Sequence, residues 1–475
     1  MNISTPLYEA LQQYIKQPKN ALHMPGHKQG NAIPAMYKKD IFKMDLTELP
    51  GLDNLHVPEG PILKAQQMAA QAFGARDSFF LVNGASCGIQ AMIAAVCMPG
   101  DEIIVDRNCH AAVFSALILT GAVPRYIYPI YNEALGLIGG ICPNDIKKAL
   151  AQYPKAKAVL ITCPTYHGIC SDLKKIAQIV HEYDKVLLVD EAHGAHFCFN
   201  EKLPISAMAA GADMCVQGAH KTLPALTQSA LLHINHTSRI DIDRVKSALK
   251  LFQTTSPSFV LMAYLDVARH VMQENGEQRL EKIISVANHI REYLNQHEDI
   301  YCINRRIIGK QGIYDVDATR FTINFNNASL TGYEVANILN QKYNIQVEMA
   351  DIYNIVCILS VGDFKKDLQD VCGAVMQIKD SIKTKHKKIK GIPPKDVHAV
   401  PTREAYFSDT QQIPLKHAVG RISASVVSCY PPCIPILCPG EMITSEMITY
   451  IYDMDVYGAK ITGLRENFSI CVIKQ

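Results

Sequence analysis

Between residues 78 and 234, short apolar runs alternate with segments of helical periodicity. Continuous apolar strands separated by helices are typical of a mainly parallel sheet that is covered on both faces. Ligands of such folds bind at the carboxyl ends of the strands, so the residues that follow each run are the first candidates for chemistry. The predicted strands are SFFLV (78–82), EIIV (102–105), KAVLIT (157–162), KVLLVD (185–190), DMCVQ (213–217) and SALLHI (229–234).

Beyond Arg239 the pattern becomes helical, with the amphipathic stretches PSFVLMAYLDVARHVMQE and EKIISVANHIREYLNQ. RFTINFN (320–326) and IVCILSV (355–361) predict strands of a smaller α+β unit, and the basic segment KTKHKKIKGIPPKD (383–396) predicts a solvated linker. We therefore predict four parts. They are an N-terminal arm with a loop (1–55), a large domain around the predicted parallel sheet (56–285), a small α+β domain (286–385) and a C-terminal domain (386–475).

Composition and charge exclude several classes of protein. A chain of 475 residues with 48% hydrophobic and 19% charged residues is typical of an ordinary globular protein. The formal net charge of +2 favours neither nucleic acid nor an anionic membrane as a partner. The start, MNISTPLYEALQQYIKQPKN, lacks the apolar core of a signal peptide, and no run of about 18 apolar residues predicts a membrane span. We expect a cytoplasmic protein.

The 15 cysteines raise the question of disulfides or a metal site. In a large chain without a secretion signal, free buried thiols are the default. HGAHFC (193–198) imitates the spacing of metal ligands, and so does HMPGH (23–27), in which proline and glycine break the helix that would bring the two histidines together. We predict neither disulfides nor a metal site.

Two residues at predicted strand ends indicate a specific chemistry. Asp190 ends the run KVLLVD, where a carboxylate can pair with a protonated ring nitrogen. Lys221 follows the run DMCVQ, and a lysine in a partly apolar pocket can form a Schiff base with an aldehyde. Either residue alone could be a helix cap or a surface lysine. Together at one edge of a sheet they favour pyridoxal 5'-phosphate (PLP), whose charged ring accepts carbanion electrons.

Two further segments fall at the same predicted edge. VNGASCGI (82–89) is a glycine-rich turn before a helix, where backbone N–H groups and Ser86 can hold a phosphate, although such turns are common. DRNCHAAV (106–113) places His110 after the next strand, where an imidazole can stack on a planar ring or serve as a helix cap.

With these residues in place, the chain resembles the Orn/Lys/Arg decarboxylases of PLP fold type I, in their short bacterial form. The resemblance covers nearly the whole length and depends on several motifs in a fixed order. The motifs are HMPGHKQG (23–30), DLTELPGLDNLHVPEGPI (45–62), VNGASCGI (82–89), DRNCH (106–110), CPTYHG (163–168), DEAHGAH (190–196), AHKTLPALTQ (219–228), TTSPSF (254–259) and YPPCIP with PGE (430–441).

The resemblance implies an α-decarboxylase of arginine or lysine, with ornithine less favoured, that acts in polyamine metabolism. Lys221 would carry PLP, Asp190 would hold the pyridine nitrogen, His110 would stack on the ring and His193 would lie near the cofactor's polar edge. A homodimer or higher homo-oligomer with shared active sites is implied, because TTSPS resembles the segment that completes the phosphate site of the second subunit. The implied phosphate-site residues are Gly84, Ala85, Ser86, His220, Thr255 and Ser256.

Charge alone suggests which residues recognise the basic side chain of the substrate. The candidates are acidic, and exposed acidic residues are common without such a role. They are Asp45, Glu48, Asp53 and Glu441.

The chain departs from the family pattern at the phosphate site. Gly218 stands where a hydroxyl residue is usual, Ala85 replaces Ser or Thr, and Ala111 and Ala112 replace Lys-Ser. Each missing hydrogen bond to a charged phosphate costs roughly 1.5–3 kcal/mol, so we expect weak cofactor retention. Two alternatives to decarboxylation remain open: another reaction of PLP fold type I, such as transamination or a lyase reaction, and a degenerate homologue without catalysis.

Overall fold

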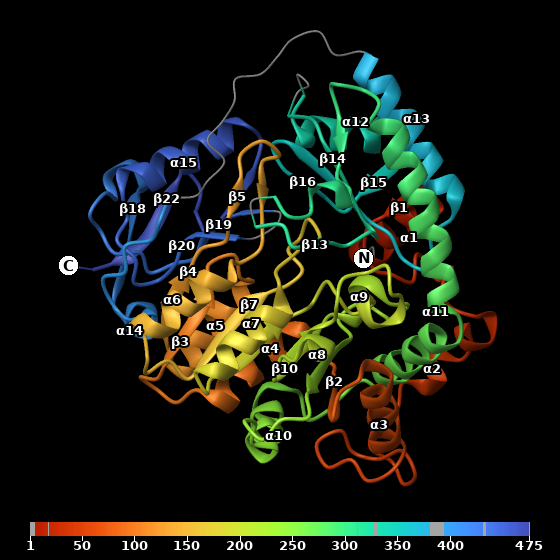
Figure 1. Ribbon diagram of the computed structural model, residues 1–475, viewed down its shortest axis with the longest axis horizontal. Coiled ribbons are helices and arrows are strands. Elements are labelled where there is room, and N and C mark those ends of the chain that lie inside the picture. Colours follow the sequence, from red (N-terminus) through yellow and green to blue (C-terminus); the bar gives the residue numbers. More distant parts are fainter. Residues whose placement is uncertain are drawn as a thin grey trace, which may run out of the picture.

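The computed structural model describes residues 5–17, 19–310, 312–326, 330–380, 394–430 and 434–474. Most of the predicted linker (383–396) and residues 431–433 of the terminal motif lie outside these ranges. A seven-stranded sheet forms the centre of the molecule (Figure 1), and its strands are parallel except β11, which runs antiparallel to both neighbours. Across the sheet the strands are β2 (Asp77–Leu81), β11 (Ala230–Ile234), β10 (Met214–Gln217), β9 (Val186–Asp190), β7 (Ala158–Thr162), β3 (Glu102–Asp106) and β4 (Val123–Ile127).

Both faces of this sheet are buried, because alternate residues of each strand pack on opposite helical layers. In β9, Leu187 and Val189 join one core, whereas Val186 and Leu188 join the other. The first layer contains α3 (Pro61–Phe73), α6 (Pro143–Gln152), α7 (Leu173–Glu182), α8 (Ala207–Ala210) and α11 (Phe259–Leu294). The second contains α4 (Gly84–Val96), α5 (Ala111–Thr120) and α10 (Ile242–Phe252).

A smaller α+β unit lies beside the large one and has its own apolar core. Its antiparallel sheet contains β12 (Tyr301–Cys302), β14 (Arg320–Asn324), β17 (Asn354–Ile358) and β16 (Met349–Ala350), packed on α12 (Gly332–Tyr343) and α13 (Lys365–Asp380). The N-terminal segment joins this unit, because β1 (Asn20–Leu22) pairs in parallel with β15 (Ile345–Val347). Short pairs are β5 (Tyr131–Asn132) with β6 (Leu137–Ile138), and β8 (Ile169–Cys170) with β13 (Asp315–Val316).

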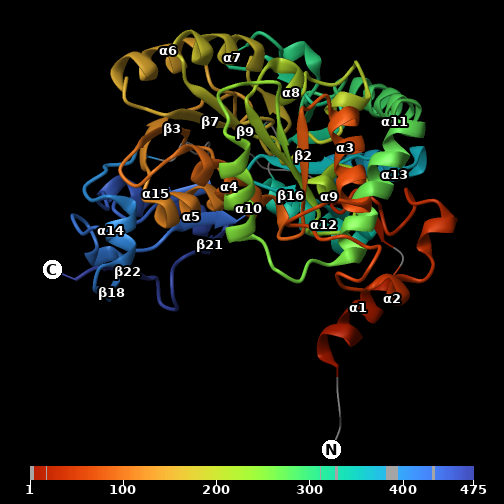
Figure 2. The ribbon, with the colours of Figure 1, turned by 90° about the horizontal axis from the view of Figure 1, so that it is seen from below.

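The C-terminal residues form a third unit with a separate core, on the side of β4 (Figures 1 and 2). It contains α14 (Thr402–Phe407), α15 (Ser445–Val456), the pair β18 (Thr410–Pro414) and β22 (Ser469–Ile473), and the sheet of β20 (Ile434–Leu437), β19 (Val427–Tyr430) and β21 (Lys460–Thr462). At the other end of the chain, α1 (Pro6–Lys16) projects away from the body without a buried residue (Figure 2).

All six predicted strands of the large sheet are present, and the predicted α/β fold class is confirmed. The sequence prediction missed β4. It also treated α11 as two separate stretches, whereas one helix runs from Phe259 to Leu294, across the predicted boundary at 285–286. We keep the four-part division as a proposal, with α11 as the bridge between the large and small parts. No helix in the described ranges is both long and apolar enough for a bilayer crossing.

Candidate active site

The carboxyl ends of the parallel strands open into a cavity of about 440 Å³. Its walls come from the large unit, from the N-terminal segment at Met24 and from the small unit at Glu348. The fold therefore brings together residues that are far apart in sequence. Eight of the predicted site residues line this cavity: Gly84, Ala85, Ser86, His110, Asp190, His193, His220 and Lys221.

Lys221 lies on α9 (Ala219–Thr222), a single helical turn that follows β10 directly. Its Nζ lies 3.0 Å from Nε2 of His193. Burial lowers the pKa of Lys221; the charge of Asp190 opposes this shift and that of Arg320 reinforces it. A lysine with a lowered pKa holds more of its neutral form, so this amine is suited to nucleophilic attack on a carbonyl.

His193 is buried and connects Lys221 to the small unit. Its Nδ1 lies 3.3 Å from Nη2 of Arg320 at the start of β14. Since a guanidinium only donates, Nδ1 must accept, and the ring proton is then on Nε2, facing Lys221. Burial, together with the charges of Lys221 and Arg320, holds the pKa of His193 well below its ordinary value. His193 is therefore a neutral imidazole that donates to the lysine amine.

Asp190 is the last residue of β9 and is 2% exposed. Its Oδ1 accepts a hydrogen bond from the backbone N of Ala192 at 3.1 Å. Two buried carboxyls lie nearby, and burial raises the pKa of Asp106 to about 7 and that of Glu191 to about 8. The charge of Asp190 adds to both shifts. A carboxylate at this position, at the end of a central strand and in the wall of the cavity, can hold a cationic ring nitrogen.

The turn after β2 presents the N-terminus of α4 to the cavity. Gly84 opens the helix with φ +78°, a conformation that favours glycine. Asn83, before it, makes no side-chain bond to the helix; its Oδ1 accepts instead from the backbone N of Thr254 at 3.2 Å. The first N–H groups of α4 remain available for an anion such as a phosphate.

The sequence prediction missed Glu348 and did not single out Tyr166. Glu348 lies between β15 and β16 of the small unit; its Oε1 accepts from Tyr166 Oη at 2.6 Å and its Oε2 from the backbone N of Met24 at 2.8 Å. The ring of Tyr166 lies against His193, with 4.6 Å between the ring centroids. Tyr166 belongs to the motif CPTYHG, which gave a signal, whereas the sequence around Glu348 gave none.

The other predicted site residues lie away from the cavity of this chain. Asp45 and Glu48 are exposed, and Asp53 accepts hydrogen bonds from backbone N–H groups at the start of α3. Glu441 is fully buried in the C-terminal unit and paired with Arg107. Thr255 and Ser256 are exposed on the segment after α10.

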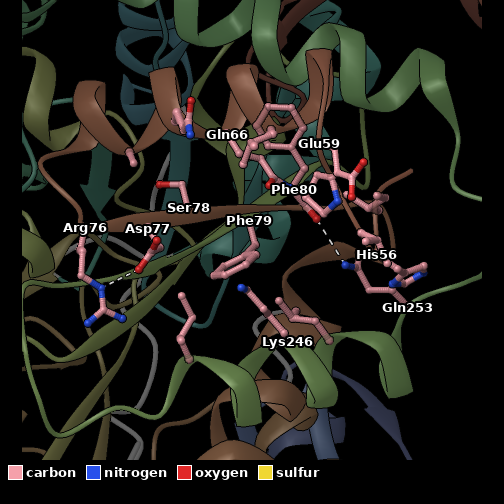
Figure 3. A pocket seen from close by; sticks show the side chains of 18 residues that line it. His56, Glu59, Gln66, Arg76, Asp77, Ser78, Phe79, Phe80, Lys246 and Gln253 are labelled. Carbon is pink, nitrogen blue, oxygen red and sulfur yellow. Dashed lines mark hydrogen bonds and ion pairs between the residues drawn. The ribbon is translucent and has the colours of Figure 1, made fainter. Parts of the chain in front are cut away.

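A second cavity of about 360 Å³ lies between α3, β2 and α10 (Figure 3). Phe79 and Phe80 line it, together with the charged side chains of Lys246 and Glu59. Gln253 in its wall accepts a hydrogen bond from the backbone N of Val82 at 2.9 Å. This amide therefore fixes the end of β2 immediately before the turn that carries Gly84.

Comparison with known proteins gives consistent matches over the whole chain. The family described as Orn/Lys/Arg decarboxylase, major domain, matches residues 5–367, and its C-terminal domain matches residues 392–469. The arginine decarboxylase of Bacillus subtilis is 40% identical over 99% of this chain and 98% of its own. The constitutive lysine decarboxylase of Escherichia coli is 25% identical over 97% of this chain and 80% of its own.

Solved structures support the same fold. Lysine decarboxylase A of Pseudomonas aeruginosa has a TM-score of 0.79 at 22% identity, covering 99% of this chain and 80% of that one. Ureidoglycine-glyoxylate aminotransferase of Bacillus subtilis has a TM-score of 0.57 at 14% identity, covering 79% and 96% of the two chains. The predicted fold class, PLP fold type I, is confirmed by these structural neighbours.

Proposed function

Because the chain belongs to the Orn/Lys/Arg decarboxylase family, we propose that it removes the α-carboxylate of arginine to give agmatine and CO2, with PLP as its cofactor. The observation that carries this proposal is the meeting of Lys221, Asp190 and the N-terminus of α4 in one cavity. We propose arginine rather than lysine as the substrate because four relatives that match at 38–40% identity over most of the chain are named arginine decarboxylase. We further propose a cytoplasmic role in polyamine metabolism.

The cavity fits PLP in its chemistry. Asp190 can pair with the ring nitrogen, the start of α4 can hold the phosphate, and Lys221 offers an amine for the aldehyde. Thr162, the last residue of β7, also lines the cavity, and its buried hydroxyl makes no hydrogen bond within the described chain. An unpaired buried hydroxyl in a cavity wall is costly unless a ligand supplies a partner.

PLP, when bound, supplies a charged ring that accepts the electrons left behind when CO2 departs. The protein's own groups prepare that chemistry. Asp190 would keep the ring nitrogen protonated, and His110, which caps α5 through a 3.1 Å bond from Ala112 N, would lie against the ring face. Neutral His193 orients the amine of Lys221 by donating a hydrogen bond from Nε2. The low dielectric around these groups strengthens each of these interactions.

Glu348 is our proposed contact for the substrate's guanidinium. Apart from Asp190, it is the carboxylate that lines the cavity among the described residues. Its hydrogen-bond partners, Tyr166 Oη and Met24 N, are neutral, so its negative charge stays available to a cation. Asp45, Glu48 and Asp53 remain proposals for the approach of the substrate, at the site of a second subunit.

The active unit is proposed to be a homodimer with shared sites. Thr255 and Ser256 are exposed on a single chain, as residues that complete a neighbour's phosphate site must be before assembly. Large apolar side chains are also exposed near the N-terminus, including Phe42 at 95% and Met36 at 73%. Exposed apolar groups of this size are typical of a surface that is covered in the assembly.

The proposed reaction is tested by measuring CO2 release from arginine, lysine and ornithine with added PLP. Arginine should be the best substrate, and Lys221→Ala should abolish the release. Borohydride reduction followed by peptide mapping should place the cofactor on Lys221. A label on Lys28 or Lys64, or keto-acid formation in place of CO2, would contradict the proposal.

The shared site is tested by mixing two inactive chains. Lys221→Ala mixed with Ser256→Asp should recover activity, because the mixed dimer has one site in which both positions are intact. Lys221→Ala mixed with Asp190→Ala should recover none, because both changes lie in the same chain's part of the site. Equal results from the two mixtures would rule out the shared arrangement.

A further inference from the structure

We propose that Glu441 is a positioning residue: through Arg107, it fixes the loop that carries His110 into the cavity. The inference rests on the proposed function for the role of His110, but its geometry stands independently. Glu441 was a candidate for substrate recognition from its charge alone. Its place in the C-terminal unit, away from the cavity, indicates a different role.

The carboxylate of Glu441 is engaged on both oxygens. Oε1 accepts from Arg107 Nη1 at 2.6 Å, and Oε2 accepts from Arg107 Nη2 at 3.0 Å and from Cys438 N at 2.9 Å. Its exposed fraction is 0%, and that of Arg107 is 7%. A bidentate pair of this kind fixes the direction of both side chains as well as their separation.

Arg107 connects the C-terminal unit to the large unit. Its guanidinium lies 4.8 Å from the ring centroid of Tyr126 and 5.7 Å from that of Phe114, and its backbone N donates to Ile127 O at 2.9 Å. A guanidinium stays charged at all accessible pH values, so its burial requires an anion. Glu441 is that anion, and its loss would leave a buried charge that moves toward water.

Movement of Arg107 would be transmitted directly to the cavity. The next three residues, Asn108, Cys109 and His110, all line it. The loop is fixed at its start by Asn108 N, which donates to Asp106 Oδ1 at 2.8 Å, and at its end by His110, which caps α5. The Arg107 side chain is the third point at which the loop is fixed. It is held there by Glu441 of the C-terminal unit.

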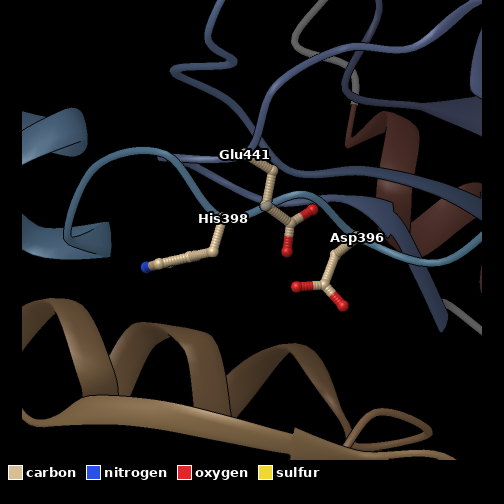
Figure 4. A group of neighbouring side chains, drawn as sticks. All are labelled: Asp396, His398 and Glu441. Atoms are coloured by element: carbon tan, nitrogen blue, oxygen red, sulfur yellow. The ribbon is translucent and has the colours of Figure 1, made fainter.

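The carboxylate of Glu441 also lies close to Asp396 and His398 (Figure 4). One ligand atom from each of these residues lies within 4.8 Å of the others, a spacing that could hold a cation. In this structure Arg107 already supplies the positive charge to Glu441. We therefore interpret Asp396 and His398 as neighbours of the ion pair.

The test is a double-mutant cycle with Arg107→Leu, Glu441→Leu and the double variant, beside the isosteric Glu441→Gln and the exposed control Glu446→Gln. Each single change should lower kcat and PLP affinity by about tenfold or more, with the KM for arginine nearly unchanged. The double variant should be no worse than the poorer single one, because an apolar pair leaves no buried charge. Glu446→Gln should match the wild type.

Hydrogen exchange of the cofactor-free protein gives a readout that does not depend on activity. Amides of residues 107–112 should exchange faster in Glu441→Gln and Arg107→Leu, and at the wild-type rate in Glu446→Gln. This result would stand even if the wild type released no CO2, so failure of the proposed function is distinguishable from failure of this inference. Unchanged amide exchange in the two variants would overturn the inference. So would effects of the two single changes that multiply in the double variant, or a tenfold rise in KM with unchanged kcat. Binding of Zn²⁺ at Glu441 would also overturn it.

Discussion

The buried carboxyl of Glu191 gives a quantitative prediction for how the free energy of unfolding depends on pH. The carboxyl is fully buried behind Asp190; Oε1 accepts from Ala207 N and Oε2 from Gln217 Nε2, both at 2.7 Å. Gln217 Oε1 lies 3.2 Å from His233 Nε2, so a chain of polar side chains runs from Glu191 through β10 to β11. Burial raises the pKa of Glu191 from 4.5 to about 8. The folded protein therefore binds this proton more tightly than the unfolded chain does.

The sign and size of the effect follow from this difference. A carboxyl with a raised folded-state pKa gives stability that is complete below pH 4.5 and is lost as the pH rises through about 8. At about 1.36 kcal/mol per pKa unit, full loss amounts to about 4–5 kcal/mol of unfolding free energy. Glu191→Gln cannot ionise, so the variant should lack this part of the pH dependence. Asp106 and Asp363 have raised pKa values for the same reason, but they affect both proteins alike.

The assay is urea unfolding of the cofactor-free protein at pH 5.5, 7 and 8.5, for the wild type, Glu191→Gln and the exposed control Glu201→Gln. The wild type should lose several kcal/mol of stability relative to Glu191→Gln between pH 5.5 and 8.5. Glu201→Gln should follow the wild type. Parallel stability curves for the wild type and Glu191→Gln would refute the reasoning, because they would mean that Glu191 titrates alike in the folded and unfolded states.

Substitutions at three glycines give further predictions. A Cβ at Gly218 would lie 2.9 Å from Ala192 O, so Gly218→Ala should weaken PLP binding, whereas Gly218→Ser should bind about tenfold or more tightly than Gly218→Ala through its added hydroxyl. Equal PLP dissociation constants in titrations of the two apoproteins would contradict this expectation. A Cβ at Gly26 would lie 2.6 Å from Leu223 O, so Gly26→Ala should displace the N-terminal segment from α9. The variant should show a clear loss of kcat and only a small decrease of Tm. Gly373 meets nothing within 4 Å, so Gly373→Ala in α13 should leave activity unchanged and stabilise the helix by up to about 1 kcal/mol in thermal unfolding.

The large sheet could be predicted because its strands are buried on both faces, which makes each of them a continuous apolar run. β4 (Val123–Ile127) was missed because Pro124 and Arg125 interrupt its run. Both are tolerated there because β4 is at the edge of the sheet, with β3 as its one paired strand among the described residues. Gly276 made α11 look like two helices. In the structure this glycine is buried against Met272, and packing along one side keeps the helix continuous.

The part of the candidate site that lies at strand ends could be predicted from the sequence. Asp190, Lys221 and His110 follow strands of one sheet, so a rule about parallel sheets places all three at one edge. Glu348 belongs to another unit, and its approach to the cavity depends on how β1 and β15 join the N-terminal segment to the small unit. No periodicity in the sequence encodes that packing, so the carboxylate that we propose for substrate recognition could come only from the structure.

Arg320 could have been noticed in the sequence, because it opens RFTINFN, a predicted strand in which apolar residues alternate with polar ones. A charged residue at the start of such a strand must either reach water or find a partner. Arg320 is 1% exposed, and its Nε and Nη1 make no hydrogen bond within the described residues. Asp317, with Oδ2 3.9 Å from Nη2, balances the charge, and Nη2 donates to Nδ1 and to the backbone O of His193. The burial of this charge is costly, but it has a functional reason: Arg320 fixes the tautomer of His193, and His193 in turn orients the amine of Lys221. A charged residue at the start of a predicted strand is therefore worth testing as a signal of function, and this signal does not depend on any motif.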